Sequence, residues 1–134
     1  MKLRISDLRH IIREVLEEQG LTFYHGTLKD AVPSILRTGL RAGQGWGGAA
    51  KPGVFLSTSP DSALYWAKMS FLTRHGLPAE ESSFDRVDPS QLVVLRVDVP
   101  PEERSNIVPR QRSYNLAGDS QYVGSVPPGW ISVL

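Results

Sequence analysis

The stretch "TFYHGT", residues 22 to 27, decides how this chain is interpreted. Its apolar and aromatic residues predict a short strand over residues 21–25, which Gly26 is expected to end. The strand therefore places His25 at its end, in a chain that has only three histidines. A single histidine in such a place is more often structural than catalytic, so its role depends on the residues that surround it.

The composition indicates one globular domain. Of the 134 residues, 40% are hydrophobic and 22% are charged, and the net charge is +1. A chain of this length buries about two thirds of its unfolded surface around a single core. The near-neutral charge does not indicate a nucleic-acid or membrane partner. Because the chain has no cysteine and its histidines are scattered, we expect no bound metal.

Two units are predicted along the chain: an N-terminal amphipathic helix within residues 1–20, and a domain over residues 21–134. We expect the helix to pack on the domain; the alternative is that it docks onto a partner or a second copy. No run of about 20 apolar residues occurs, and the N-terminus lacks the apolar core of a signal peptide, so a cytoplasmic protein without membrane contact is expected. The apolar stripe of the helix consists of Ile5, Leu8, Ile12, Val15 and Leu16.

Helices and strands alternate after the first strand. Residues 28–40 predict a helix that Asp30 caps and Gly39 ends. Its buried face is expected to carry Ala31, Ile35 and Leu36. Residues 41–53 contain five glycines and predict a flexible loop over a pocket.

Four further strands and one helix follow that loop. Residues 53–58 predict a strand, and residues 59–72 a helix with Ser59 as its cap and Pro60 at its first position. Residues 91–99 form the clearest strand, and their nearly continuous apolar character predicts burial on both faces. Residues 121–126 and 130–134 predict two final strands.

The order of these elements resembles the ADP-ribosyltransferase superfamily. The shared features are His-Gly-Thr after the first strand, a Gly-Val-Phe-Leu-Ser strand, Ser-x-x-Tyr on a helix and Gln-Tyr-Val in a late strand. The resemblance is to the His-Tyr-Glu branch, which includes diphtheria toxin and the poly(ADP-ribose) polymerases, and it covers residues 22–70 well and 91–131 more loosely. It implies an α+β fold: a split β-sandwich of two small, mainly antiparallel sheets with flanking helices and an NAD cleft.

The resemblance implies a role for each matching residue at the cofactor site. His25 is similar to the family histidine that hydrogen-bonds a ribose hydroxyl of NAD. The backbone of Gly26 is similar to the group that holds the nicotinamide amide, and Thr27 follows in the same site. Ser62 and Tyr65 resemble the helix residues that hold this amide and stack on the nicotinamide ring.

Helical geometry agrees with that pairing, because a spacing of three places Ser62 and Tyr65 on one face. Trp66 lies about 100° further round and is expected in the core. Trp46, in the glycine-rich loop, is expected to cover adenine or an acceptor. Arg41 is expected either to contact the NAD diphosphate or to lie on a solvated surface. The same two alternatives apply to Arg37 and Lys51.

Two positions depart from the family pattern. Phe55 stands where the family motif has its first tyrosine, so the ring is kept without the hydroxyl. Gln121 stands where the family usually has a glutamate, which predicts a slow enzyme, a different reaction or a binder. Two alternatives stay open: a Glu-to-Gln change that traps the substrate, or a charge supplied by Asp119.

The resemblance implies an NAD-dependent ADP-ribosyltransferase with His25, Phe55 and Gln121 at its catalytic centre. NAD is the co-substrate, nicotinamide is released, ADP-ribose passes to a protein or nucleic-acid acceptor, and no metal takes part. The closing "GSVPPGWI" is similar to the ends of small bacterial and phage members, so a bacterial or phage-infected cell is expected. The alternatives are a non-catalytic module that binds NAD or ADP-ribose, and an enzyme like the RNA 2′-phosphotransferases.

Overall fold

The computed structural model describes residues 21–43, 53–109 and 120–134. The predicted N-terminal helix lies outside these residues, as do most of the glycine-rich loop, Trp46, Lys51 and Asp119. The expectations for those parts therefore stay predictions.

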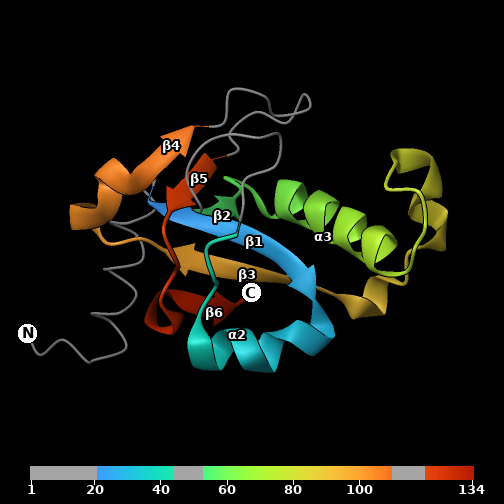
Figure 1. The fold of residues 1–134 in the computed structure, drawn as a ribbon, viewed down its shortest axis with the longest axis horizontal. Helices are drawn as coiled ribbons and strands as arrows, with labels where there is room; N and C mark the ends of the chain where they lie inside the picture. The colour runs from blue at the N-terminus through green and yellow to red at the C-terminus, as the bar shows by residue number, and fades with distance from the viewer. Residues whose placement is uncertain (1–20, 44–52, 110–119) are drawn as a thin grey trace, which may run out of the picture.

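The described residues form two antiparallel sheets of three strands each, with helices beside them (Figure 1). The predicted α+β fold with two small antiparallel sheets is confirmed at this level. The first sheet has the order β1 (Thr22–Leu28), β3 (Leu92–Asp98) and β6 (Ile131–Val133), and the second has the order β2 (Gly53–Leu56), β5 (Ser120–Val123) and β4 (Ile107–Pro109). The helices are α2 (Val32–Thr38) and α3 (Pro60–Arg74), with 3-10 turns η1 (Lys29–Ala31), η2 (Glu81–Arg86), η3 (Pro89–Gln91), η4 (Pro101–Asn106) and η5 (Pro128–Trp130).

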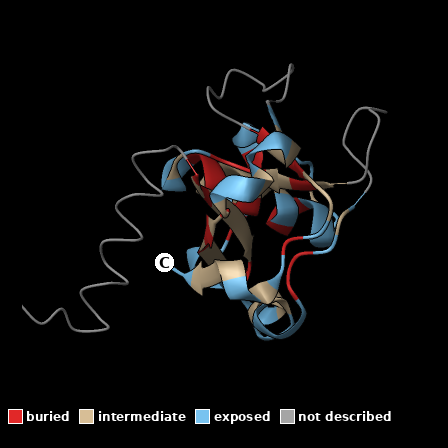
Figure 2. Cartoon of the chain, turned by 90° about the vertical axis from the view of Figure 1, so that its left-hand side faces the viewer, coloured by how far each residue is buried: buried red, intermediate tan, exposed pale blue. Residues whose placement is uncertain are grey.

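One hydrophobic core is shared by the two sheets. Alternate residues of each strand point to it, because successive side chains of a strand lie on opposite faces. Buried residues lie in the central strands and on one side of α3, and exposed residues surround them (Figure 2). The core consists of Phe23, Val97 and Val99 from the first sheet and its end, Val54, Leu56 and Tyr122 from the second, and Leu40 and Val126 from the connections.

Helix α3 begins as the sequence predicts. The Ser59 hydroxyl accepts a hydrogen bond of 3.2 Å from the backbone N–H of Ser62, and Pro60 occupies the first turn. The hydroxyl thus satisfies one of the N–H groups that the first turn of a helix leaves without an intrahelical partner. Further along, Phe71 and Leu72 of α3 form a second buried cluster with Leu28 and Val87.

The structure corrects three expectations around β1 and α2. Gly26 does not end β1, because pairing with β3 continues to Leu28 opposite Leu92. Asp30 makes no capping hydrogen bond; its carboxylate lies 2.8 Å from Arg74 in an exposed ion pair. Leu36 is 43% exposed and is not part of a buried face.

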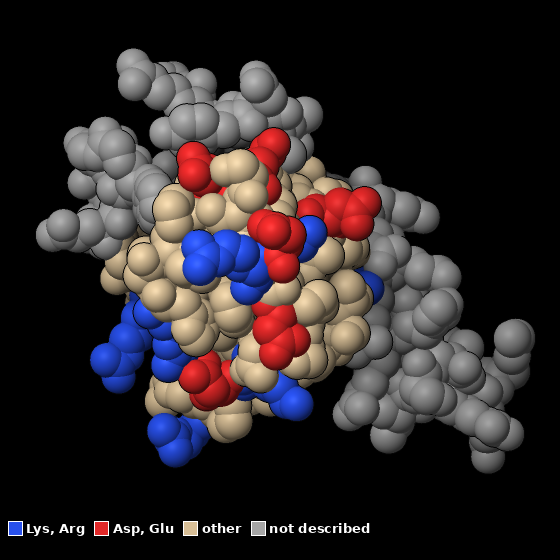
Figure 3. All heavy atoms as spheres, turned by 90° about the vertical axis from the view of Figure 1, so that its right-hand side faces the viewer, with Lys and Arg blue, Asp and Glu red and all other residues tan. Residues whose placement is uncertain are grey.

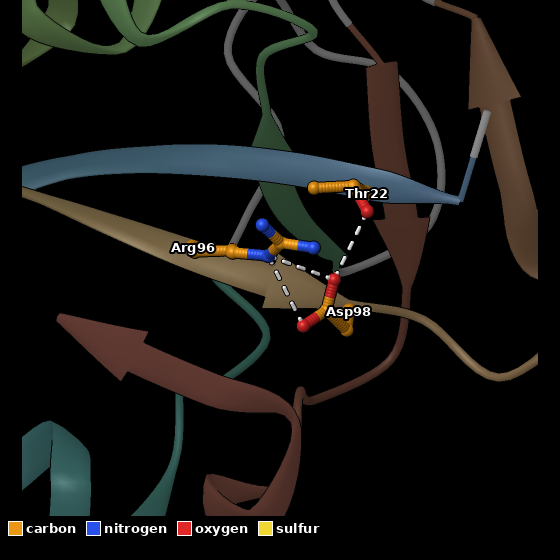
Figure 4. Close-up of polar contacts among 3 residues, drawn as sticks. All are labelled: Thr22, Arg96 and Asp98. Atoms are coloured by element: carbon orange, nitrogen blue, oxygen red, sulfur yellow. Dashed lines mark hydrogen bonds and ion pairs between the residues drawn. The ribbon is translucent and has the colours of Figure 1, made fainter. Parts of the chain in front are cut away.

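Strand β3 is buried at Leu95 and Val97 on one face, and not on both faces as predicted. Leu95 and Val97 are completely buried, whereas the alternate residues are only partly so. Two of those carry charge: Arg96 Nε lies 3.1 Å from an Asp98 carboxylate oxygen, which also accepts a 3.0 Å hydrogen bond from the Thr22 hydroxyl (Figure 4). A charge taken out of water needs such partners. Among the described residues, no helix has the length and apolar character that a bilayer crossing requires.

Candidate functional site

The candidate site lies where β1 and β2 separate. The strands are joined by a single pair, Tyr24 and Ser57, in which the backbone N–H of each donates to the other's carbonyl over 2.8 Å. An antiparallel ladder would continue with Gly26 opposite Phe55. In its place, the imidazole of His25 lies against the strand, with Nδ1 2.8 Å from the Phe55 carbonyl oxygen. The two sheets therefore split at His25.

The hydrogen bond to Phe55 determines which nitrogen of His25 carries the proton. A carbonyl oxygen can only accept, so Nδ1–H donates and Nε2 of the neutral ring is left as an acceptor. Burial lowers the pKa of His25 below its usual 6.5, and the bond to the Phe55 carbonyl opposes this only in part. The ring is therefore neutral at pH 7, and Nε2 can accept a hydrogen bond from a hydroxyl.

Lowering the pH is expected to destabilise the fold through His25. Its folded pKa lies below the unfolded value, so the unfolded chain binds more protons between the two values. The stability that His25 contributes is fully present above about pH 6.5. Below that pH, the free energy of unfolding falls by at most about 1.4 kcal/mol per pH unit. Denaturant unfolding of the wild type and of His25→Asn, whose amide can donate but does not titrate, measures this. Parallel pH profiles for the two proteins would contradict it.

Gly26 presents its backbone to the split. The N–H and C=O of Tyr24 point toward Ser57, and those of Gly26, two residues further, point the same way because backbone direction alternates along a strand. On its other side, Gly26 is in contact with α3. A Cβ at this position would collide with the Ala63 carbonyl oxygen and would lie 2.9 Å from the Ala67 Cβ. The glycine is thus required by helix packing.

Strands β2 and β5 bring the two departures from the family pattern together. Phe55 lies directly opposite Gln121, so both side chains are on one face of the sheet, with Val108 of β4 on the far side of Gln121. A Cβ on Gly53 would collide with the Gln121 side-chain amide. The side chain of Gln121 therefore lies across β2 at Gly53. His25 thus contacts the backbone of Phe55, and Phe55 lies opposite Gln121 on the next strand.

A row of aromatic rings leads from β2 across α3 to η2. The ring centroids of Phe55 and Trp66 are 5.0 Å apart, those of Trp66 and Tyr65 5.2 Å, and those of Tyr65 and Phe84 5.4 Å, all in edge-to-face geometry. The prediction that Trp66 belongs to the core is wrong: it is partly buried and contacts Phe55. Ser62 and Trp66 are four residues apart, about 40° on a helix, so Trp66 shares the face of Ser62.

Residues beyond α3 surround Tyr65, and sequence reasoning missed them. Burial raises the pKa of the Tyr65 hydroxyl, as do the negative charge of Glu81 and a hydrogen bond to its carboxylate. Glu81 and Phe84 belong to η2, inside a polar segment whose sequence carries no signal of contact with α3. Only the folded chain brings them to Tyr65.

For the remaining predicted site residues, the structure gives the degree of burial. Ser62 is buried at the first turn of α3, and Thr27 is partly buried on β1 after Gly26. Arg37 and Arg41 are exposed, which fits either a diphosphate contact or a solvated surface. Trp46 cannot be assigned a position because it lies outside the described residues.

Charges of both signs are mixed on the face that carries the C-terminal part of α3 and the 3-10 turns η2 and η3 (Figure 3). The exposed pair of Arg74 and Asp30 is one example. On the described part of this face, neither sign forms a continuous patch. Because nucleic-acid affinity depends on clustered basic groups, this face does not indicate a nucleic-acid acceptor.

Comparison with known proteins assigns no family: no protein-family model matches the chain, and neither does any curated protein. The function must therefore be inferred from the site.

Proposed function

We propose that this chain binds NAD at the split between β1 and β2 and transfers ADP-ribose to a protein or nucleic-acid acceptor, with release of nicotinamide. The observation that carries the proposal is the hydrogen bond of His25 to Phe55 at that split, with Gly26 next to His25 and Gln121 opposite Phe55. The proposal includes the finer fold assignment, in which the two sheets form an ADP-ribosyltransferase-like split sandwich.

The backbone of Gly26 matches the carboxamide of nicotinamide. It offers one donor and one acceptor on the side that faces the split, and a primary amide offers the complementary acceptor and donor. Ala63 packs directly on Gly26, which supports a position for its neighbour Ser62 beside the same opening. The proposed nicotinamide pocket therefore has Gly26 at its base, with Ser62 and Tyr65 supplied by α3.

His25 and Gln121 are proposed to hold the riboses. The unprotonated Nε2 of His25 accepts a hydrogen bond from a ribose hydroxyl, and the amide of Gln121 orients the ribose that carries nicotinamide. The bond between C1′ and the nicotinamide nitrogen breaks, and its electron pair leaves with neutral nicotinamide. A lone pair of the acceptor then bonds to C1′, and the acceptor's proton passes to solvent. Positioning and electrostatics supply the catalysis.

A second candidate is favoured by the neutral side chain at position 121. With no carboxylate there, the site could bind NAD or ADP-ribose without cleaving it. Such a non-catalytic module would show binding with no nicotinamide release. Release that depends on a 2′-phosphorylated RNA would instead indicate the phosphotransferase.

The test is calorimetric binding of NAD together with nicotinamide release, for the wild type and His25→Ala. We expect the wild type to bind NAD and the variant to bind about 2- to 13-fold more weakly, because one hydrogen bond contributes about 0.5–1.5 kcal/mol. The matched control is His75→Ala, which removes an exposed histidine at the end of α3. A wild type that binds no NAD, or equal affinities for the wild type and His25→Ala, would contradict the proposal.

A further inference from the structure

Trp66 occupies a central place in the aromatic row. It is the residue of α3 whose ring contacts Phe55 on β2, and it also contacts Tyr65. Tyr65 is the residue proposed to stack on nicotinamide, and Phe55 belongs to the proposed catalytic centre. Trp66 is only partly buried, unlike Ala63 and Ala67, which pack α3 onto β1 and are completely buried. The indole therefore lies at the wall of the proposed pocket and not beneath it.

The chemistry of an indole suits one half of NAD in particular. The nicotinamide ring of NAD is a pyridinium and carries a positive charge, whereas the dihydronicotinamide of NADH is neutral. Tryptophan binds a cation on its ring face more strongly than tyrosine or phenylalanine does. At its far end the same aromatic row already holds a cation, because the Lys68 ammonium lies 5.2 Å from the centre of the Phe84 ring.

We infer that Trp66 is a further NAD-binding residue, whose indole contacts the charged nicotinamide ring and favours oxidised over reduced NAD. The inference rests on the proposed function, since it requires NAD at the split. Because the ring loses its charge as nicotinamide leaves, this contact strengthens substrate binding and not the chemical step. Loss of the indole should therefore weaken NAD binding without slowing turnover.

The experiment compares the affinities of the full chain for NAD, NADH and ADP-ribose, measured by calorimetry. In Trp66→Leu, the NAD affinity should fall roughly 2- to 30-fold, while those for NADH and ADP-ribose change less than about 2-fold. Trp66→Phe, which keeps a ring, should lie between and serves if the leucine variant does not fold. The matched controls are Trp130→Phe and Trp130→Leu, because Trp130 also makes an edge-to-face contact, with Tyr122 at 5.4 Å, but packs on the core.

The outcomes separate this inference from the proposed function. If Trp66→Leu weakens the binding of NAD, NADH and ADP-ribose equally, Trp66 has a structural role and the inference is overturned. The same result in Trp66→Phe has the same meaning if the leucine variant does not fold. An unchanged ratio of NAD to NADH affinity would also overturn it. If the wild type binds ADP-ribose but not NAD, the inference about Trp66 is overturned, because no nicotinamide ring is bound. The protein would then be a module that binds ADP-ribose. A wild type that binds none of the three ligands would refute the proposed function itself.

Discussion

Replacing Gln121 with glutamate is expected to raise the rate of nicotinamide release by about two to four decades. Positive charge develops on the ribose as nicotinamide leaves, and a carboxylate about 4 Å away would stabilise it by about 4 kcal/mol at an effective dielectric constant of about 20. That free energy corresponds to roughly three decades in rate. Glutamine can hold the same ribose hydroxyl but carries no charge.

The structure indicates that the change can be made without disturbing the fold. Gln121 is only partly buried, and its side chain lies on the face that carries Phe55 and not in the core. The rates are measured as nicotinamide released from NAD at saturating concentration. Gln91→Glu is the matched control, because it makes the same chemical change at an exposed position in η3. NAD binding without release by Gln121→Glu would favour the non-catalytic module.

Replacing Gly26 with alanine is expected to lower the free energy of unfolding by about 3 kcal/mol or more and to abolish NAD binding. The added Cβ would meet the Ala63 carbonyl oxygen, and it would lie 2.8 Å from the Ala63 carbonyl carbon. These are backbone atoms, so no side-chain rotation relieves the collision. Helix α3 must move away from β1, which displaces Ser62 and Trp66 from the split.

Two comparisons test this explanation. Ala63→Gly in the Gly26→Ala background should not restore stability, because the collision is with the backbone of residue 63 and not with its side chain. Gly129→Ala is the matched control, since a Cβ there has no atom within 4 Å. Urea unfolding gives the free energies, and calorimetry gives the NAD affinities. A Gly26→Ala protein of wild-type stability would show that α3 does not pack as described.

Local features could be predicted from the sequence by itself. The start of α3 depends on Ser59, Pro60 and the first-turn N–H groups, all within a few residues, and was predicted correctly. The positions of β1, β2, β3, β5 and β6 follow closely from apolar patterning and turn residues, which are also local signals, whereas the two small antiparallel sheets were implied by the family resemblance. His25, Phe55 and Gln121 were grouped from the family pattern, and the structure brings them to adjacent strands.

What only the tertiary structure decided depends on contacts between residues far apart in the chain. Asp30 could cap a helix or pair with Arg74, 44 residues away, and its short sequence context does not distinguish the two. The sequence alone predicts that Gly26 ends a strand, and only the structure shows that α3 packs against it. Trp66 was expected in the core because it lies about 100° round the helix from Tyr65, and this spacing carries no information about the position of Phe55. Such pairings are determined by how the whole chain packs, and local propensities and residue spacing carry no information about that packing.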